Sequence, residues 1–300
     1  MRTETIDALT AYARGAPDVM LLTADLGYSV LERFAEALPK QYVNVGVCEQ
    51  AMVGIAAGLA LTGHRVVLYS IVNFPTLRCL EQLRNDVCYH DLPVMVIAVG
   101  GGLAYGPQGY THHGVEDLGI MAMLPNMAVA CPADPLEAEA LLPQLLDRRR
   151  PAYLRLARSG EPVLHPAGTK VTLERAITLR SGTDIALLAT GPILGRALAA
   201  AQTLAARGIS ASVLSFPGFR PLDQQAVLDA ARGHRAILTL EEHMVTGGFG
   251  SRVAEVLLAA GLAPRFGKYG VTDALRGQIG SQAWLLDRLG PVEDHAMALL

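Results

Sequence analysis

The stretch Asn44–Met52, NVGVCEQAM, places one acidic side chain, Glu49, at the start of an apolar helical pattern. The continuation from Ala51 to Leu61, AMVGIAAGLAL, is uncharged and rich in glycine and alanine, so a helix here can pack closely on all sides. A carboxyl group at the entrance of such a helix is partly withdrawn from water, which favours its protonated form. Acidic residues are also common in first helical turns because they face the positive end of the helix dipole. The local pattern therefore leaves both a functional and a purely structural role for Glu49 open.

The composition predicts a well-packed protein without nucleic-acid partners. Of the 300 residues, 51% are hydrophobic and 18% are charged, which argues against disorder and leaves room for two cores. The net charge of −3 gives no basic field for nucleic acid. The one basic cluster, Arg148-Arg149-Arg150, ends a helical pattern and is interpreted as solvated surface.

Neither the cysteines nor the N-terminus indicates export. Cys48, Cys79, Cys88 and Cys131 have no metal-ligand spacing and are typical of buried thiols in a reducing compartment. The first residues, MRTETIDALTAYARG, are polar and amphipathic, and no apolar run approaches the roughly 20 residues of a membrane helix. We therefore expect a soluble, cytoplasmic protein with no membrane contact.

Short apolar runs alternate with longer helical patterns, which predicts an α/β fold with mainly parallel sheets. The run 94–99, VMVIAV, is typical of a strand that is buried on both faces. In the first half we expect strands at 19–23, 42–45, 65–70, 93–99, 127–131 and 152–156, and helices at 3–14, 30–38, 49–61, 76–90, 115–123 and 135–148.

A segment of irregular composition divides the chain. Residues 159–168, SGEPVLHPAG, contain two prolines and two glycines and have no hydrophobic period, which predicts a linker. A second α/β unit follows, with strands expected at 184–189, 211–216, 236–241 and 265–268 and helices at 193–207, 223–232 and 250–260. The prediction is two consecutive three-layer α/β/α domains, residues 1–160 and 171–300, joined by a linker at 161–170.

Four motifs occur in a fixed order along the first half. They are Thr23–Ser29 (TADLGYS), Asn44–Met52, Phe74–Asp86 (FPTLRCLEQLRND) and Gly106–Asp117 (GPQGYTHHGVED). In this order they resemble the pyrimidine-binding and C-terminal domains of the transketolase family of thiamine diphosphate enzymes, and in particular the C-terminal subunit of a split transketolase. The resemblance covers nearly the whole chain and is strongest from Thr23 to Arg158.

The resemblance implies a cofactor role for Glu49. In the family, a carboxyl group at this position bonds to the aminopyrimidine ring nitrogen and favours the imino tautomer, so that the exocyclic nitrogen can take a proton from the thiazolium carbon. Phe74 matches a ring that stacks on the pyrimidine, and Leu77 stands where other members have a second aromatic ring. Asp25 is expected to support cofactor binding across the subunit contact.

The resemblance also implies substrate contacts. His112 lies in a glycine-rich loop between a strand end and a helix start, where open α/β sheets bind ligands. The family's histidine at this position lies beside the reactive face of the cofactor and exchanges protons with the substrate. The positions that match those holding a substrate phosphate are Arg2, Ser29 and Arg158. His113 and Gln108 are further candidates for contact with substrate.

Two departures from the family pattern affect the substrate. Gly100 stands where ordinary transketolases have a histidine, and Gln108 stands where they have an acidic residue in a GEDG loop. Those groups contact sugar hydroxyls, so the usual pentose phosphates are not implied. In the second half, 246–251, TGGFGS, is interpreted as a tight strand-to-helix turn, and the preceding His243 is only a weak site candidate.

The family's motif for diphosphate and magnesium, GDG with a downstream Asn, does not occur in the chain. The resemblance therefore implies a partner subunit with that motif, so that thiamine diphosphate and Mg²⁺ lie between subunits of an α2β2 heterotetramer with an apolar contact. The expected reaction transfers a two-carbon ketol unit from a ketose, phosphorylated as in the family, to an aldehyde.

Three alternatives stay open. One is a carboligase similar to 1-deoxyxylulose 5-phosphate synthase, which would consume pyruvate and release carbon dioxide, as the Thr111–Asp117 run also fits. Another is the beta subunit of a 2-oxoacid dehydrogenase, which would need a lipoyl carrier protein. The third is a non-catalytic interaction subunit, which the changes at Gly100 and Gln108 would fit.

Overall fold

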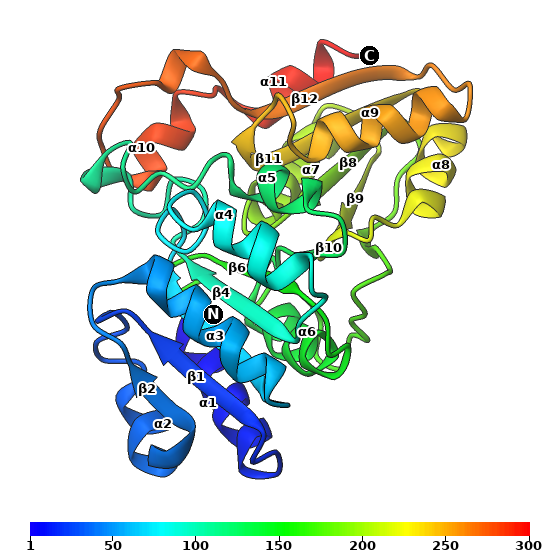
Figure 1. Ribbon diagram of the computed structural model, residues 1–300. Helices are drawn as coiled ribbons and strands as arrows, with labels where there is room; N and C mark the ends of the chain where they lie inside the picture. Colours follow the sequence, from blue (N-terminus) through cyan, green and yellow to red (C-terminus); the bar gives the residue numbers. More distant parts are fainter.

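Two sheets organise the chain in a computed structural model that describes residues 1–300 (Figure 1). The first sheet has the strand order β10-β5-β6-β4-β3-β1-β2. All of its neighbouring strands are parallel except β10, which pairs antiparallel with β5. Its strands are β1 (Val19–Thr23), β2 (Tyr42–Asn44), β3 (Arg65–Ile71), β4 (Val94–Val99), β5 (Ala128–Ala130), β6 (Ala152–Leu156) and β10 (Gly218–Arg220).

The second sheet has the order β12-β11-β8-β9-β7. It is parallel except at one edge, where β7 runs antiparallel to β9. Its strands are β7 (Ile177–Arg180), β8 (Ile185–Thr190), β9 (Ala211–Ser215), β11 (Ala236–Met244) and β12 (Arg265–Val271).

Helices cover both faces of each sheet, as their apolar residues require. On the first sheet, α1 (Arg2–Arg14), α2 (Glu32–Ala37) and α6 (Pro135–Asp147) share one core, and α3 (Glu49–Leu61) and α5 (Asp117–Met123) pack on the other face. On the second, α7 (Leu194–Ala206) and α11 (Val292–Met297) lie opposite α8 (Gln224–Gly233) and α9 (Phe249–Ala259). The predicted α/β class with mainly parallel sheets is confirmed. None of these helices has the length and apolarity that a membrane span requires.

Some elements differ from the prediction. The expected helix at 76–90 is instead a turn, a short α4 (Leu80–Gln82) and a π-helix, η2 (Leu83–Cys88), because helical periodicity in a sequence does not distinguish these windings. The short edge strands β7 and β10 and the helix α10 (Gln282–Asp287) were not predicted. A three-residue strand such as β10 has no period of its own, and it forms through its pairing with β5.

The two halves of the chain share a core. One hydrophobic cluster contains Met52 and Val53 from α3 together with Phe249 and Val253 from α9. The strand β10, although it comes from the second half of the sequence, completes the first sheet. In Figure 1 the second half lies against the first, and α10 contacts the short helix η3 (Gly106–Gln108) that follows β4. The halves are therefore packed as one body.

A buried histidine holds the segment between the two halves. His165 Nδ1 lies 2.9 Å from Asp134 Oδ2, and His165 Nε2 lies 3.0 Å from Glu137 Oε1. Asp134 caps the N-terminus of α6, and Ser215 Oγ of β9 donates to Glu137 Oε1 at 2.6 Å. Burial alone would lower the pKa of His165, but its contacts with the two carboxylates outweigh that effect and raise the pKa to about 9. The imidazolium thus ties the linker to α6, and Glu137 continues the connection to β9 of the second half.

This bridge predicts a pH-dependent stability. Because the folded-state pKa of His165 lies above its ordinary value of 6.5, its contribution is complete below about pH 6.5 and is lost as the pH rises through about 9. His165→Gln should lower the free energy of unfolding at pH 6 by about 3 kcal/mol, and the difference from the wild type should shrink by pH 9.5. Urea unfolding at both pH values measures it. The exposed His90→Gln is the control, and a pH-independent difference would contradict the bridge.

Candidate active site

Parallel strands of the first sheet end at one edge, and the predicted site residues follow these ends. Glu49 follows β2, Phe74 follows β3 and His112 follows β4, while Asp25 and Arg158 follow β1 and β6. Because β1, β2, β3, β4 and β6 run parallel in one sheet, their carboxyl ends face the same side. Open α/β sheets bind ligands at such an edge.

Glu49 is the first residue of α3, and its side chain is only 4% exposed. Its Oε2 accepts a hydrogen bond of 2.8 Å from a guanidinium nitrogen of Arg78. A carboxylate removed from water needs such a partner, because a buried unpaired charge costs several kcal/mol. Arg78 itself is 48% exposed, so the pair joins a buried carboxylate to a cationic side chain that reaches solvent.

Aromatic contacts extend from this pair to the other predicted residues. The Arg78 guanidinium lies 4.6 Å from the centroid of the Phe74 ring. Phe74 meets the His112 ring edge-to-face, with 5.5 Å between their centroids. His112 in turn lies 6.4 Å from the Tyr105 ring, over which Arg158 lies at 6.0 Å. The structure thus connects Glu49, Phe74, His112 and Arg158 through neighbouring side chains.

The place of the Arg78 guanidinium tests whether this site fits an aminopyrimidine. The guanidinium is a flat group that contacts the Phe74 ring and donates a hydrogen bond to Glu49. A protonated aminopyrimidine offers the same two features, a flat π surface and an N–H donor. The residues present therefore fit the cofactor's ring at this place, provided that Arg78 moves aside.

Asp25 and Ser29 lie in the exposed loop between β1 and α2, and both have left-handed backbone angles, with φ of 55° and 64°. Such angles are uncommon outside glycine and persist when local contacts fix them. Asp25 N–H donates to Asn44 Oδ1 at 3.0 Å, and the Asp25 carboxylate accepts from Tyr28 Oη at 3.0 Å. Ser29 N–H donates to Glu32 Oε1 at 2.8 Å. The Asn44 contact ties the loop to the segment that leads into α3, and the other two hold the loop to itself and to α2.

The remaining predicted residues occupy separate places. Leu77 is 46% exposed, and Gln108 is exposed at the end of η3. Arg2 begins α1, and its Nε is buried without a hydrogen-bond partner. The His113 side chain points into its own loop, where Nε2 lies 3.1 Å from the Gly106 carbonyl oxygen. His113 is buried, so this geometry holds the loop together and does not present the ring to a substrate.

Two site residues were not found from the sequence. Arg78 stands within a quoted motif, but no pattern showed that it would reach Glu49, 29 positions earlier. Tyr105 fills the space beside Gly100: a Cβ at Gly100, where φ is 80°, would lie 2.0 Å from the tyrosine ring. Gly100 is therefore required by Tyr105, which stands beside His112 and Arg158. The only signal in the sequence for these two residues was that each follows an apolar strand, β3 for Arg78 and β4 for Tyr105.

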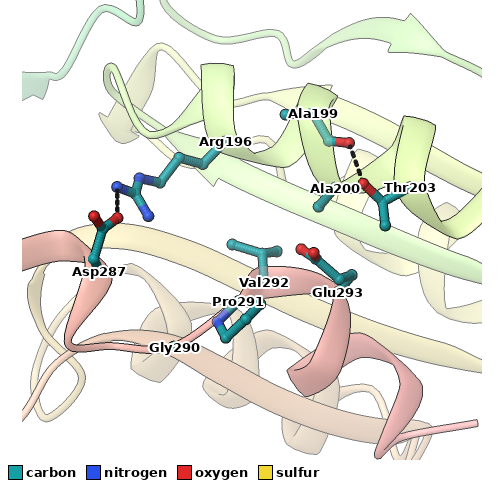
Figure 2. A pocket seen from close by; sticks show the side chains of 9 residues that line it. All are labelled: Arg196, Ala199, Ala200, Thr203, Asp287, Gly290, Pro291, Val292 and Glu293. Atoms are coloured by element: carbon teal, nitrogen blue, oxygen red, sulfur yellow. Dashed lines mark hydrogen bonds and ion pairs between the residues drawn. The ribbon is translucent and has the colours of Figure 1, made fainter. Parts of the chain in front are cut away.

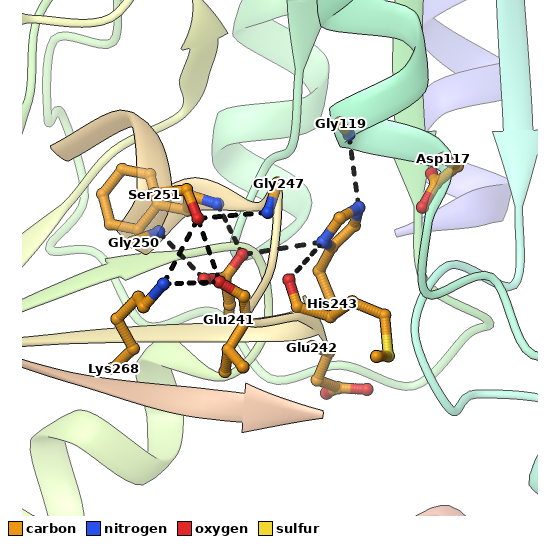
Figure 3. Close-up of polar contacts among 12 residues, drawn as sticks. Asp117, Gly119, Glu241, Glu242, His243, Gly247, Gly250, Ser251 and Lys268 are labelled. Carbon is orange, nitrogen blue, oxygen red and sulfur yellow. Dashed lines mark hydrogen bonds and ion pairs between the residues drawn. The ribbon is translucent and has the colours of Figure 1, made fainter. Parts of the chain in front are cut away.

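The turn at 246–251 is held by a buried carboxyl group of the protein, that of Glu241. The Glu241 carboxylate accepts hydrogen bonds from the backbone N–H groups of Phe249 and Gly250 at the start of α9 (Figure 3). Burial raises the pKa of Glu241 to about 7, although these N–H groups oppose the rise. His243 is buried too, and its Nε2 accepts from Gly119 N–H at 3.2 Å. This corner is a structural turn, as the sequence indicated.

Two surface hollows lie away from Glu49, Phe74, His112 and Arg158, and His243 is among the residues that line the second. One, of about 380 Å³, lies between α7 and the chain's end, where Arg196 pairs with Asp287 at 2.7 Å (Figure 2). The other, of about 520 Å³, lies between α5 and α9. Neither hollow is lined by Glu49 or by the residues connected to it, which are Arg78, Phe74, His112, Tyr105 and Arg158. The strand-end edge is therefore the candidate site because of its chemistry and not because of its volume.

Comparisons with known proteins agree along the chain. Residues 1–161 match the family model "Transketolase, pyrimidine binding domain", and residues 174–295 match "Transketolase, C-terminal domain". The chain is 35% identical to a 6-deoxy-6-sulfo-D-fructose transketolase subunit, SqwH, from Clostridium sp. (strain MSTE9), over 94% of this chain and 91% of the relative. It is 37% identical to an apulose-4-phosphate transketolase subunit of Phocaeicola vulgatus, over 84% of this chain and 81% of that relative.

Solved structures and longer relatives are also similar. A structure described as "Split gene transketolase, inactive beta4 tetramer" matches with a TM-score of 0.88 and 33% identity, over 99% of this chain and 95% of that one. A 1-deoxy-D-xylulose-5-phosphate synthase of Pelotomaculum thermopropionicum is 36% identical over 96% of this chain, which spans 46% of that relative.

The Arg78–Glu49 pair predicts an energetic coupling in the isolated chain. In a double-mutant cycle of Arg78→Met and Glu49→Gln, the interaction should be worth about 1–2 kcal/mol, because one partner is buried and the other is half exposed. Urea unfolding of the four proteins measures the coupling. The control is Arg33–Asp7, an exposed pair separated by 3.7 Å, which should couple by less than about 0.5 kcal/mol. Additive effects of the two site substitutions would exclude the pair in solution.

Proposed function

The chain belongs to the transketolase family, and we propose that it is the pyrimidine-binding subunit of a split, thiamine diphosphate-dependent transferase. The observation that carries this proposal is the geometry around Glu49. A buried carboxylate and the Phe74 ring together contact one flat donor group, the Arg78 guanidinium. An aminopyrimidine would replace the guanidinium, with its ring nitrogen on Glu49 and its face on Phe74.

Each residue near that ring has a task in the proposed reaction. When bound, thiamine diphosphate supplies the carbon nucleophile that carries a two-carbon unit. Glu49 holds a proton between its carboxyl group and the pyrimidine nitrogen, in a place that excludes water. Arg78 releases Glu49 and turns toward solvent, which its 48% exposure permits. His112, edge-to-face with Phe74, exchanges protons with substrate oxygens.

The substrate is proposed to be a ketose with an anionic end, from which a ketol unit passes to an aldehyde. The names of two relatives specify a sulfonated sugar and a sugar phosphate. Arg158 is exposed and lies over Tyr105, so its guanidinium can form a fork of hydrogen bonds with a phosphate or sulfonate. We assign Arg2, Ser29 and Gln108 to further substrate contacts on the family resemblance alone.

A partner subunit is proposed to bind the diphosphate and Mg²⁺ through GDG and a downstream Asn, in an α2β2 heterotetramer. Exposed apolar residues on α3 and just before it support a protein contact there, since Val47 is 74%, Ile55 43% and Leu61 68% exposed. The split-gene relative is described as an inactive β4 tetramer, which supports the proposal that such subunits associate with themselves and need another subunit for activity.

A second candidate function is supported by the synthase relatives. Several 1-deoxy-D-xylulose-5-phosphate synthases are 35–38% identical to parts of this chain, although it spans less than half of their length. That reaction releases carbon dioxide from pyruvate, whereas ketol transfer between sugars does not. Assays of the reconstituted subunits for carbon dioxide release separate the two functions.

Cofactor affinity should depend on the partner. Titration of the purified chain with thiamine diphosphate and Mg²⁺ in a calorimeter should give little heat, because the chain supplies only the pyrimidine contacts. Addition of the partner subunit should produce saturable binding. Tight binding by the isolated chain would contradict a divided site.

Glu49→Gln should leave assembly with the partner intact but lower the rate of thiazolium C2–H exchange by about 10²–10⁴-fold, as expected for loss of a proton-transfer group. The exchange is followed by NMR in D₂O, and ketol transfer is measured in parallel. Glu139→Gln, an exposed change on α6, is the matched control. Near-normal exchange in Glu49→Gln would remove Glu49 from cofactor activation.

A further inference from the structure

The loop that carries His112 has both of its ends in the core of the second half. Leu103 enters the loop and Val115 leaves it, and both are almost completely buried. They belong to a hydrophobic cluster otherwise formed largely by β8, β11 and α7, including Leu187 and Leu240. The loop thus starts from a strand of the first sheet but packs its ends against the second.

Glu242 fixes the first end of this loop. It lies near the end of β11, is 6% exposed, and accepts a 3.2 Å hydrogen bond from Leu103 N–H through Oε2. Gln282 of α10 donates to both carboxylate oxygens, at 3.1 and 3.0 Å. The fit is close: a Cβ at Gly102 would lie 2.5 Å from Glu242 Oε2. A buried carboxylate with these partners costs free energy to move.

The other end of the loop is fixed by the same part of β11. Met244 N–H donates to the Val115 carbonyl oxygen at 2.8 Å. One Arg155 nitrogen donates both to the Gly114 carbonyl oxygen and to the Glu242 carbonyl oxygen, each at 2.7 Å. Figure 3 shows His243 of β11 bonded to Gly119, which follows the loop, while the neighbouring Glu242 side chain points the other way. Arg155 therefore ties the loop to the second half.

We infer that the second half of the chain sets the position of the His112 ring, and that Glu242 is a positioning residue for the reaction. This inference rests on the proposed function of His112. The contacts from the first half hold the middle of the loop: Asn73 Nδ2 donates to the carbonyl oxygens of Thr111 and His113, at 2.9 and 3.0 Å. The contacts from the second half hold its two ends, at Leu103 and Val115. A displacement of about 1 Å at a reacting group can cost about 100-fold in rate. We call the contacts of Glu242 and Met244 with the two ends of the loop the clamp. The clamp therefore controls turnover without touching substrate.

Hydrogen–deuterium exchange tests the clamp without any activity. In Glu242→Ala, peptides that cover residues 103–115 should exchange their amides at least several-fold faster, because Leu103 N–H loses its acceptor. Peptides that cover α3, residues 49–61, should be unchanged. Glu242→Gln keeps one acceptor oxygen and should show a smaller effect. The matched control is Glu255→Gln, an exposed carboxylate on α9 that has no contact with the loop.

Kinetics of the reconstituted subunits then separate positioning from general damage. In Glu242→Ala, kcat for ketol transfer should fall by about 10- to 100-fold. Exchange of the thiazolium C2 proton, which depends on Glu49, should stay within about twofold of the wild type. Glu242→Gln should restore part of kcat, and Glu255→Gln should match the wild type.

Several outcomes would overturn the inference. They are unchanged loop exchange in Glu242→Ala, unchanged kcat despite faster loop exchange, or an equal fall in transfer and C2 exchange. If Glu242→Ala does not fold, Gln282→Ala, which removes a donor to Glu242, should show the same effects in smaller size, and wild-type behaviour would reject the clamp. Absence of C2 exchange in the wild-type pair would instead reject the proposed function, and the loop measurements would still stand by themselves.

Discussion

A carboxylate that is almost completely withdrawn from water needs a hydrogen-bond donor beside it. For Glu49 this donor is the Arg78 guanidinium, which is half exposed and can be replaced by another donor. Its burial follows from the small residues of α3, which let the helix pack closely on the first sheet. The free energy lost by dehydrating this charge is recovered only while a donor faces it. Arg78 meets that need from a half-exposed position. A ligand with a flat donor edge can therefore take its place without leaving the acid unpaired.

The parallel sheet explains why the other residues gather around this acid. Successive parallel strands send their carboxyl ends to one edge, so loops that are distant in sequence become neighbours there. Phe74 and His112 come from adjacent strands, β3 and β4, and their rings meet edge-to-face. Tyr105 lies on the other side of the His112 ring, and it leaves no space for a side chain at Gly100. The absence of a side chain at that position is thus a consequence of packing.

The sequence was sufficient to predict the fold class and to name candidate site residues within motifs. It did not predict features that depend on contacts between distant segments. Alternating strands and helices predicted the α/β class, and the family resemblance implied cofactor and substrate roles for Glu49 and His112, which stay predictions. No local pattern indicated that Arg78 would turn back to Glu49, or that Glu242 would bond to Leu103, 139 positions earlier. The edge strand β10 is likewise formed by its partner and not by its own propensity. Such features depend on tertiary packing, which a single sequence does not display.

The same contacts argue that the second half of the chain is not an accessory. A separable domain would have its own core and few polar contacts across its boundary. Here β10 completes the first sheet, and one hydrophobic cluster includes residues of both halves. His165 and Glu137 further connect α6 to β9 through Ser215, in a buried network whose loss would leave charges unpaired. The second half also bonds to both ends of the loop that carries His112, through Glu242 and Met244. The position of His112 therefore depends on both halves, whereas the Glu49–Arg78 pair is formed within the first half alone.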